Sequence, residues 1–174
     1  MRISKTALLV GVLPLASLLA ETEVAVANNG FEEGKKGWTD DKGTTQVLKE
    51  AAFKGEGGLR IVDNSPEDYV RVISDPIKIT PGKTYRLECS FNQVAGHGVN
   101  SILWFLDKDQ EIIPLPDGGR HLIRPSDTSK GWEKKSVEGK APEGAVYAQI
   151  HIQSNRIATD TTVDWDEFTL KQLD

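Results

Sequence analysis

Two adjacent carboxylates near the end of the chain carry the clearest capacity for chemistry. The run Val163 to Leu170 is apolar at 163, 165, 168 and 170, so the two-residue alternation of a strand slips by one residue after Trp165. Such a slip predicts a β-bulge, which turns neighbouring side chains away from the pleat. Asp166, with or without Glu167, would then face a cation site at the sheet edge. Carboxylate oxygens suit Ca²⁺. The alternative is a solvated acidic pair.

A second group of residues has the chemistry of a sugar-binding surface, which needs an aromatic platform flanked by planar amides or charged groups. The even positions of Ala145 to Gln153 are apolar and should face a core. The odd positions, Tyr147, Gln149, His151 and Gln153, should share the other face. By the same reasoning the strand that starts at Tyr85 would present Arg86 and Asn92 on its outer face. In Ser101 to Asp107 both phases are apolar, and Trp104 faces outward if Leu103 and Phe105 fill the core. These residues share one surface provided that the three strands are neighbours.

The longest stretch without clear alternation, Pro116 to Gly131, leaves a second interpretation of Trp104 open. This loop could fold over the ring and bury it, since tryptophan is usually mostly buried. Three charged or titratable residues of the loop, Arg120, His121 and Arg124, could rim a binding site or be ordinary solvated side chains.

The sequence favours a non-catalytic protein. The three histidines, His97, His121 and His151, are far apart and form no known catalytic or transition-metal motif. The glycines of Lys54 to Gly58 lack the following Lys-Ser/Thr and helix of a phosphate-binding loop. Paired carboxylates could serve glycoside hydrolysis. However, an acidic β-sandwich supplies such pairs by chance, so catalysis is the minority interpretation.

The elements that position these residues are all strands. The period stays close to two from Val24 onward, and short turns such as Pro81-Gly82-Lys83 separate the runs. The predicted strands are Val24 to Glu32, Thr44 to Glu50, Gly58 to Val62, Tyr69 to Ile79, Tyr85 to Val94, Asn100 to Asp107, Glu111 to Leu115, Trp132 to Glu138, Ala145 to Gln153 and Thr161 to Leu173. Short turns without helical crossovers predict an all-β fold, a jelly-roll β-sandwich of two antiparallel sheets.

Residues 1–20 have the pattern of a secretory signal peptide: Arg2 and Lys5, then a short apolar run, then small residues up to Ala20. Cleavage after Ala20 fits best; a second small-residue site at Ala25-Val26-Ala27 would remove the first predicted strand. No lipobox and no later anchoring run follow, so a secreted or periplasmic, soluble product is expected. Residues 21–174 form one domain-sized unit of 154 residues.

Charge and cysteine content narrow the possible partners. The full chain of 174 residues has 21 Lys and Arg against 26 Asp and Glu, a net charge of −5, which becomes −7 when Arg2 and Lys5 are removed. Binding to nucleic acid or to an anionic membrane is therefore not expected. The single cysteine, Cys89, cannot form an internal disulfide and alternates with Tyr85, Leu87 and Phe91, which predicts a small core residue.

Seven motifs occur in the order typical of one family. They are Asn28-Asn29-Gly30-Phe31-Glu32, Trp38, Gly57-Gly58-Leu59-Arg60-Ile61, Pro81-Gly82-Lys83-Thr84-Tyr85, Gly131-Trp132, Ala141-Pro142-Glu143-Gly144-Ala145 and Trp165-Asp166-Glu167-Phe168-Thr169-Leu170. In these residues the chain resembles carbohydrate-binding modules of the galactose-binding-like jelly-roll type, over essentially all of residues 21–174. Trp38 and Trp132 occupy motif positions that are typical of packing residues. Trp165 falls on the side of its strand that the alternation predicts to face the core.

The resemblance also implies a structural Ca²⁺ ion. In the resembled family, an acidic residue after the early Phe and another on the last strand share calcium with backbone carbonyls. Carried over, these are Glu32 and Asp166, with carbonyls near Lys54 to Gly57. Glu167 stands where the family usually has Asp. The alternative is that Glu32 and Asp166 are merely exposed edge residues.

The sequence thus predicts a monomeric, secreted, non-catalytic module that binds a polysaccharide or oligosaccharide on a concave sheet face. Its predicted ligand-binding residues are Trp104, Gln149, His151, Tyr147, Asn92 and Arg86, and its predicted metal ligands are Glu32 and Asp166. Two alternatives remain open: an adhesion or assembly domain without sugar affinity, and a small glycan-acting hydrolase or lyase.

Overall fold

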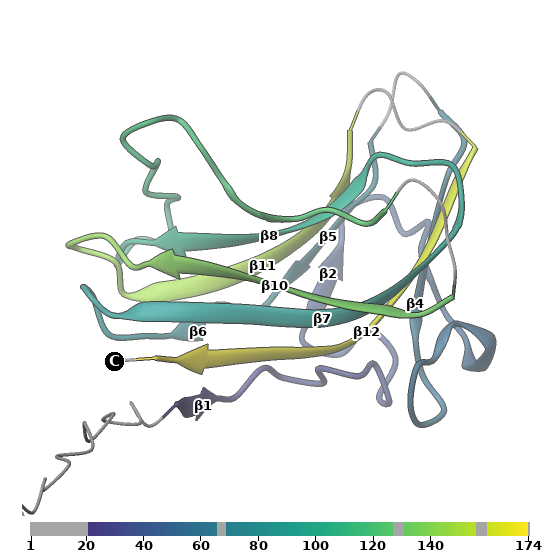
Figure 1. Ribbon diagram of the computed structural model, residues 1–174, viewed down its shortest axis with the longest axis horizontal. Helices are drawn as coiled ribbons and strands as arrows, with labels where there is room; N and C mark the ends of the chain where they lie inside the picture. Colours follow the sequence, from purple (N-terminus) through teal and green to yellow (C-terminus); the bar gives the residue numbers. More distant parts are fainter. Residues whose placement is uncertain (1–20, 66–68, 127–130, 156–159, 174) are drawn as a thin grey trace, which may run out of the picture.

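Two antiparallel sheets lie face to face, as Figure 1 shows for the computed structural model, which describes residues 21–65, 69–126, 131–155 and 160–173. The first sheet runs β10 (Glu133–Lys140), β7 (Thr84–Ala95), β12 (Thr161–Gln172), β4 (Leu59–Asp63), β3 (Gln46–Val47), with β1 (Thr22–Val24) beside β12. The second runs β2 (Trp38–Asp40), β5 (Arg71–Ser74), β11 (Tyr147–Ser154), β8 (Val99–Leu106), β9 (His121–Ile123), with β6 (Ile77–Lys78) beside β11. The predicted jelly-roll β-sandwich is confirmed.

The core lies between the sheets and is built by the alternation visible in the sequence. In β7 the side chains of Tyr85, Leu87, Cys89 and Phe91 are all buried, while Arg86 and Glu88 between them are only partly buried. Burial raises the pKa of the Cys89 thiol, so this side chain is an inert core residue, as predicted.

The bulge predicted in the last strand is present. Asp166 pairs with Ser90 and Thr169 with Glu88, so three steps along β12 match two along β7. The extra residue, Glu167, adopts a positive φ of 52°. Phe168 is thereby returned to the core, where it is fully buried and contacts Trp165 and Trp38.

The predicted strand Val24 to Glu32 is wrong beyond its first residue. The chain leaves β1 at Val24 and turns at Asn28, whose positive φ of 46° suits a turn and not a strand. The Asn28 side chain closes the turn: its Nδ2 donates to the carbonyl of Gly34, and its Oδ1 accepts from the N–H of Glu33.

Other predicted strands are shorter or interrupted. Tyr69 to Ile79 divides into β5 and β6 around Pro76, which has no N–H to donate to a ladder. Thr44 to Glu50 contains only β3 and the start of a short 3₁₀ helix, η1 (Lys49–Ala51). Glu111 to Leu115 provides one isolated bridge, between Ile112 and Leu106.

Two strands were not foreseen: β2, which begins at Trp38, and β9, which lies inside the predicted loop Pro116 to Gly131 and pairs with β8. The remaining predicted strands are confirmed to within two residues at each end. The predicted signal peptide, residues 1–20, lies outside the described residues.

Candidate functional site

The outer face of the second sheet collects the polar and aromatic residues that the alternation of β11 predicted. Gln149 of β11 lies opposite Trp104 of β8, and His151 lies opposite Ile102. On the other side of β11, Gln153 lies opposite Arg71 of β5. The predicted neighbourhood of Trp104, Gln149 and His151 is therefore present.

A hydrogen-bonded chain holds the amide and imidazole of this face in place. Gln149 Nε2 donates to the backbone carbonyl of Ser74 at 3.0 Å, and Gln149 Oε1 lies 2.8 Å from His151 Nε2. A carbonyl can only accept, so Oε1 must accept from a protonated His151 Nε2, which leaves Nδ1 as the acceptor of the ring. Burial, and then the charge of Arg71, lower the pKa of His151 to about 4, so the ring is neutral at pH 7.

The ring of Trp104 is half-buried, so it is neither the fully exposed platform nor the fully covered side chain that the sequence allowed. The edge of His151 meets it at 6.2 Å between ring centroids. On its other side, the guanidinium carbon of Arg120 lies 5.9 Å from the ring centroid, a cation–π arrangement. Arg120 belongs to the segment suspected of covering Trp104, and it covers the ring only in part.

A polar pocket of about 360 Å³ opens beside this cluster. It is lined by Tyr69, Arg71, Arg120, Gln153, Ser154 and Asn155. The guanidinium carbon of Arg71 lies 5.9 Å from the centroid of the Tyr69 ring, and its Nε donates to Asp41 at 2.7 Å. Arg120 links the pocket to Trp104, so ring and pocket form one continuous surface, called here the Trp104 face.

Two predicted ligand-binding residues lie elsewhere. Arg86 and Asn92 belong to β7, which pairs with β10 and β12 in the first sheet and not with β8 or β11. The assumption that the three strands are neighbours is therefore wrong for β7. Arg86 hydrogen-bonds Glu138 at 2.7 Å and Glu21 at 2.5 Å, so its donors are used within its own sheet.

Tyr147 shares the face of Gln149 and His151 but lies at the far end of β11. Gln153 lies six positions further along the chain, a distance of about 20 Å along a strand. A ligand that spans both would have to follow the strand direction.

The remaining tryptophans and His121 serve packing. Trp38 and Trp165 are buried in the core, and Trp38 Nε1 donates to the carbonyl of Ala27. Trp132 is half-buried and packs on Phe53 at 5.3 Å between centroids. His121 turns inward against Phe105, at 5.6 Å, so it does not rim the Trp104 face.

The two carboxylates that the resemblance assigned to calcium both contact the segment between η1 and β4. Asp166 is fully buried, and its Oδ2 accepts from the N–H groups of Phe53 and Lys54 at 2.7 and 3.0 Å. Burial raises the pKa of Asp166 despite these bonds. Glu32, which is exposed, accepts from the N–H groups of Glu56 and Gly57 at 3.0 and 3.2 Å.

Backbone donors thus occupy the positions where the resemblance implies backbone carbonyl ligands. Ca²⁺ takes six to eight oxygen ligands, and an N–H group aimed at a carboxylate already satisfies the lone pair that would bind it. These donors occupy three of the about four acceptor sites of each carboxylate, so few sites are left for a cation. This arrangement does not fit the implied calcium site, and calcium binding stays a prediction from the resemblance.

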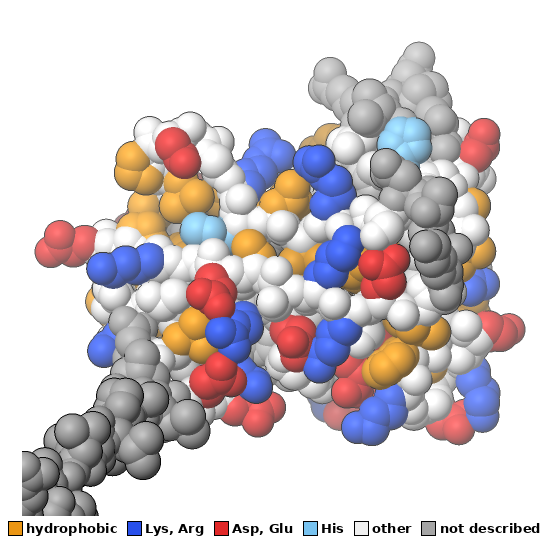
Figure 2. Space-filling view, viewed as in Figure 1, with side chains coloured by type: hydrophobic (Ala, Val, Ile, Leu, Met, Phe, Trp, Pro, Cys, Tyr) orange, Lys and Arg blue, Asp and Glu red, His pale blue; other side chains and the backbone are white. Residues whose placement is uncertain are grey.

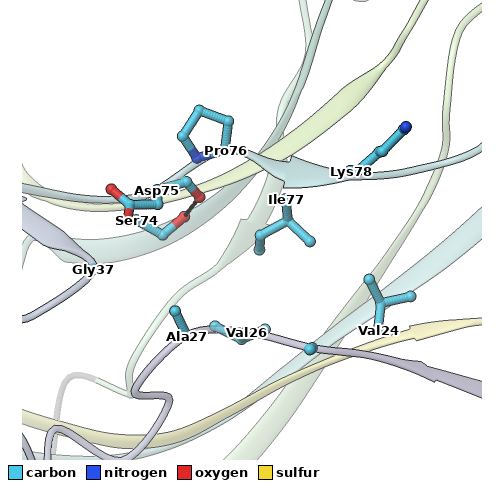
Figure 3. A pocket seen from close by; sticks show the side chains of 10 residues that line it. Val24, Val26, Ala27, Gly37, Ser74, Asp75, Pro76, Ile77 and Lys78 are labelled. Atoms are coloured by element: carbon cyan, nitrogen blue, oxygen red, sulfur yellow. Dashed lines mark hydrogen bonds between the residues drawn. The ribbon is translucent and has the colours of Figure 1, made fainter.

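A second pocket, of about 310 Å³, lies at one edge of the sandwich between residues 24–27 and β6. Figure 3 shows the side chains of Ile77 and Val24 facing each other across it, with Lys78 pointing away. Its lining contains neither an aromatic ring nor a side-chain amide. It therefore lacks the groups on which sugar recognition depends.

Sequence reasoning named Arg120 as a possible rim residue but missed Tyr69 and Arg71. A usable signal was present in Tyr69 to Ile73. Val70 and Val72 are buried in the core, so their alternation places Tyr69 and Arg71 on the outer face by the same rule that placed Gln149.

The architecture is similar to that of solved carbohydrate-binding modules. A family 16 carbohydrate-binding module superposes with a TM-score of 0.65 at 19% identity, covering 83% of this chain and 97% of that one. The module TmCBM61, solved with β-1,4-galactotriose, gives 0.56 at 17%, covering 84% and 97%. The Stig cyclase Fisc from Fischerella sp. TAU, solved with an indole compound, gives 0.66 at 13%, covering 88% and 98%. Identities this low show the shared fold alone, and the predicted structural resemblance is confirmed at that level.

No protein-family model matches the sequence, and no curated protein matches it. In the part of the chain that the structure describes, no helix has the length and apolar character needed to cross a bilayer.

Proposed function

We propose that this protein binds carbohydrate without catalysing a reaction, and that it does so on the Trp104 face. The half-buried Trp104 ring offers its remaining surface to the C–H face of a sugar. Gln153 and the two arginines of the pocket offer planar donors to hydroxyl groups beside it. The neighbouring modules of families 16 and 61, whose names describe carbohydrate binding, support this proposal.

One observation carries the proposal: the polar groups beside Trp104 are ordered before any ligand arrives. Ser74 holds Gln149, and Gln149 holds the neutral ring of His151 against Trp104. A surface whose rotamers are already fixed loses little side-chain entropy on binding. A small entropy loss matters for sugar sites, because water competes well for every hydroxyl group of the ligand.

Affinity electrophoresis against a panel of neutral and acidic polysaccharides tests the proposal. Trp104→Ala should weaken retention at least about tenfold, since aromatic contact area dominates such interfaces. Trp132→Ala is the matched control, because it also removes a half-buried tryptophan, but one that directly precedes β10 of the other sheet. Equal retention of both variants would contradict the assigned site, and melting curves of both variants exclude misfolding as the cause.

The same panel separates the alternative functions. An adhesion or assembly domain without sugar affinity predicts no retention of the wild-type protein on any glycan. A small hydrolase or lyase predicts new reducing ends when the wild-type protein is incubated with a glycan. The cyclase neighbour demonstrates that this fold can house an enzyme.

The proposal includes export of a monomer. Residues 1–20 would be removed after Ala20, leaving 154 residues. Intact-mass measurement and N-terminal sequencing of the secreted product test the cleavage position; a first residue other than Glu21 would contradict it. Sedimentation of the product tests the monomeric state.

A further inference from the structure

The pocket of the Trp104 face is basic on a chain that is acidic overall. Two of its six lining residues are arginines, and none is acidic, although the full chain has a net charge of −5. Charged groups of one sign in a hollow focus their field on whatever enters it. The pocket therefore attracts anions while the molecule as a whole repels them.

Arg120 is the more available of the two charges. Its side chain is exposed, and it makes no ion pair with any carboxylate in the described part of the chain. Its contact with Trp104 holds the guanidinium at the pocket wall without using its five N–H donors on another side chain. Donors held in place by a ring stay free for a ligand.

Arg71 lines the same pocket in a partly neutralised form. Both its Nε and one terminal nitrogen contact the same oxygen of Asp41, at 2.7 and 2.5 Å. The pair leaves other N–H donors of Arg71 unengaged by Asp41, and Tyr69 lies beneath the guanidinium. Asp41 thus orients the guanidinium of Arg71 and neutralises part of its charge. The positive charge of Arg120 is left for an anionic ligand to neutralise.

We propose that the pocket lined by Arg71 and Arg120 takes the anionic group of an acidic glycan, a uronate carboxylate or a sulfate ester, while Trp104 contacts the sugar ring. A planar guanidinium matches both oxyanions through paired N–H donors. This assignment rests on the carbohydrate-binding function proposed above and specifies its substrate class.

The test compares polymers that differ only in charge. Polygalacturonate is paired with its carboxyl-reduced form, and a sulfated galactan with its desulfated form, in titration calorimetry at low and high salt. Wild-type protein should bind at least one charged polymer about tenfold or more tightly than its neutral counterpart. That advantage should shrink at high salt, because the charged interaction is screened.

Arg120→Gln should abolish the preference for the charged polymer, so that this variant binds the charged and the neutral polymer of a pair equally. Arg86→Gln is the control, since it removes the same charge from the other sheet. Arg71→Lys, which keeps the charge but loses the planar fork, should weaken the preference in part. The pair of polymers that responds identifies carboxylate or sulfate as the group bound.

Two results would overturn the inference in different ways. Equal binding to charged and neutral polymers would contradict the acidic preference, and so would an Arg120→Gln variant that behaves like Arg86→Gln. Carbohydrate binding itself would still stand in that case, provided that Trp104→Ala weakens binding as expected. Absence of binding to every polymer overturns the carbohydrate-binding function and the acidic preference together.

Discussion

The two outer faces of the sandwich differ in how their arginines are partnered. On the first sheet, opposite charges pair across strands: Arg60 with Asp164, Arg86 with Glu138, and Lys134 with Glu88. Figure 2 shows acidic and basic side chains interspersed over β10, β7 and β12. On the second sheet, Arg71 and Arg120 lie against aromatic rings beside a pocket; Arg71 is also paired with Asp41, whereas Arg120 has no carboxylate partner among the described residues.

This difference distinguishes a face whose charged groups already have protein partners from a face that can accept a ligand. A cross-strand ion pair uses its donors within the protein, so a ligand would have to break it. A guanidinium held by a ring keeps donors for an incoming group. Composition alone does not distinguish these faces, because both carry charges; the partner of each charge does.

The largest expected effect concerns the neutral imidazole of the Trp104 face. The pKa of His151 is lowered from 6.5 to about 4, so between these values only the unfolded chain takes up the proton. Stability should therefore fall as the pH drops from 6.5 to 4, by up to about 3 kcal/mol. Chemical denaturation at pH 7, 5 and 4 measures this loss.

His151→Gln should flatten that part of the stability profile, and His97→Gln, at an exposed position, should leave it as in the wild type. If His151→Gln and wild type lose stability in parallel, the imidazole is not held neutral by the fold.

The next largest effect lies in the first sheet. Asp164 is fully buried and binds Arg60 through two bonds, of 2.7 and 2.9 Å. Asp164→Ala should cost roughly 2 kcal/mol of unfolding free energy, less than for a fully buried pair because Arg60 can still reach water. Binding to glycans should not change. A variant that folds well but binds poorly would show that the two faces are coupled.

A smaller effect is expected at the segment that holds Glu32. Gly55 has a φ of 77°, and a Cβ there would lie 2.0 Å from Glu32 Oε1. Gly82 has a φ of 76° with open space around it, so Gly82→Ala measures the backbone cost alone, about 1 kcal/mol. Gly55→Ala should cost about 1 kcal/mol more, through lost Glu32 hydrogen bonds. Equal melting temperatures for the two variants would mean that Glu32 contributes nothing.

The exposed pair Lys134 and Glu88, 2.7 Å apart, should contribute least. Lys134→Ala is expected to change the unfolding free energy by less than about 0.5 kcal/mol, because solvent screens an exposed pair. A loss comparable to that of Asp164→Ala would contradict the distinction between buried and exposed pairs on this face.

Addition of chelator should leave the melting temperature unchanged, because N–H donors occupy most of the acceptor sites of Glu32 and Asp166. A drop on adding chelator, abolished by Asp166→Ala, would instead establish the calcium site that the family resemblance implies.

Features that depend on one strand were predictable from the sequence. The slip in alternation located the bulge at Asp166 and Glu167, and the inward phase identified Cys89 and Trp165 as core residues. Burial repeats every second residue in a strand, so a single run of sequence contains this information.

Features that depend on which strands pair were not predictable. Alternation placed Arg86 and Asn92 on an outward face, as found, but could not say that β7 belongs to the other sheet. The position of Arg120 over Trp104 depends on the path of a loop that has no periodicity. Strand order is decided by contacts between residues far apart in the chain, which a local pattern does not record.

The central position of β12 in the first sheet governs when that sheet can be completed. β7 and β4 both pair with β12 and not with each other, although β12 comes last in sequence. During synthesis, each would expose an unpaired edge until residues 161–172 are available. During synthesis, folding of this sheet therefore ends when β12 inserts between β4 and β7. Until then the unpaired edges of β4 and β7 are open to association with other chains.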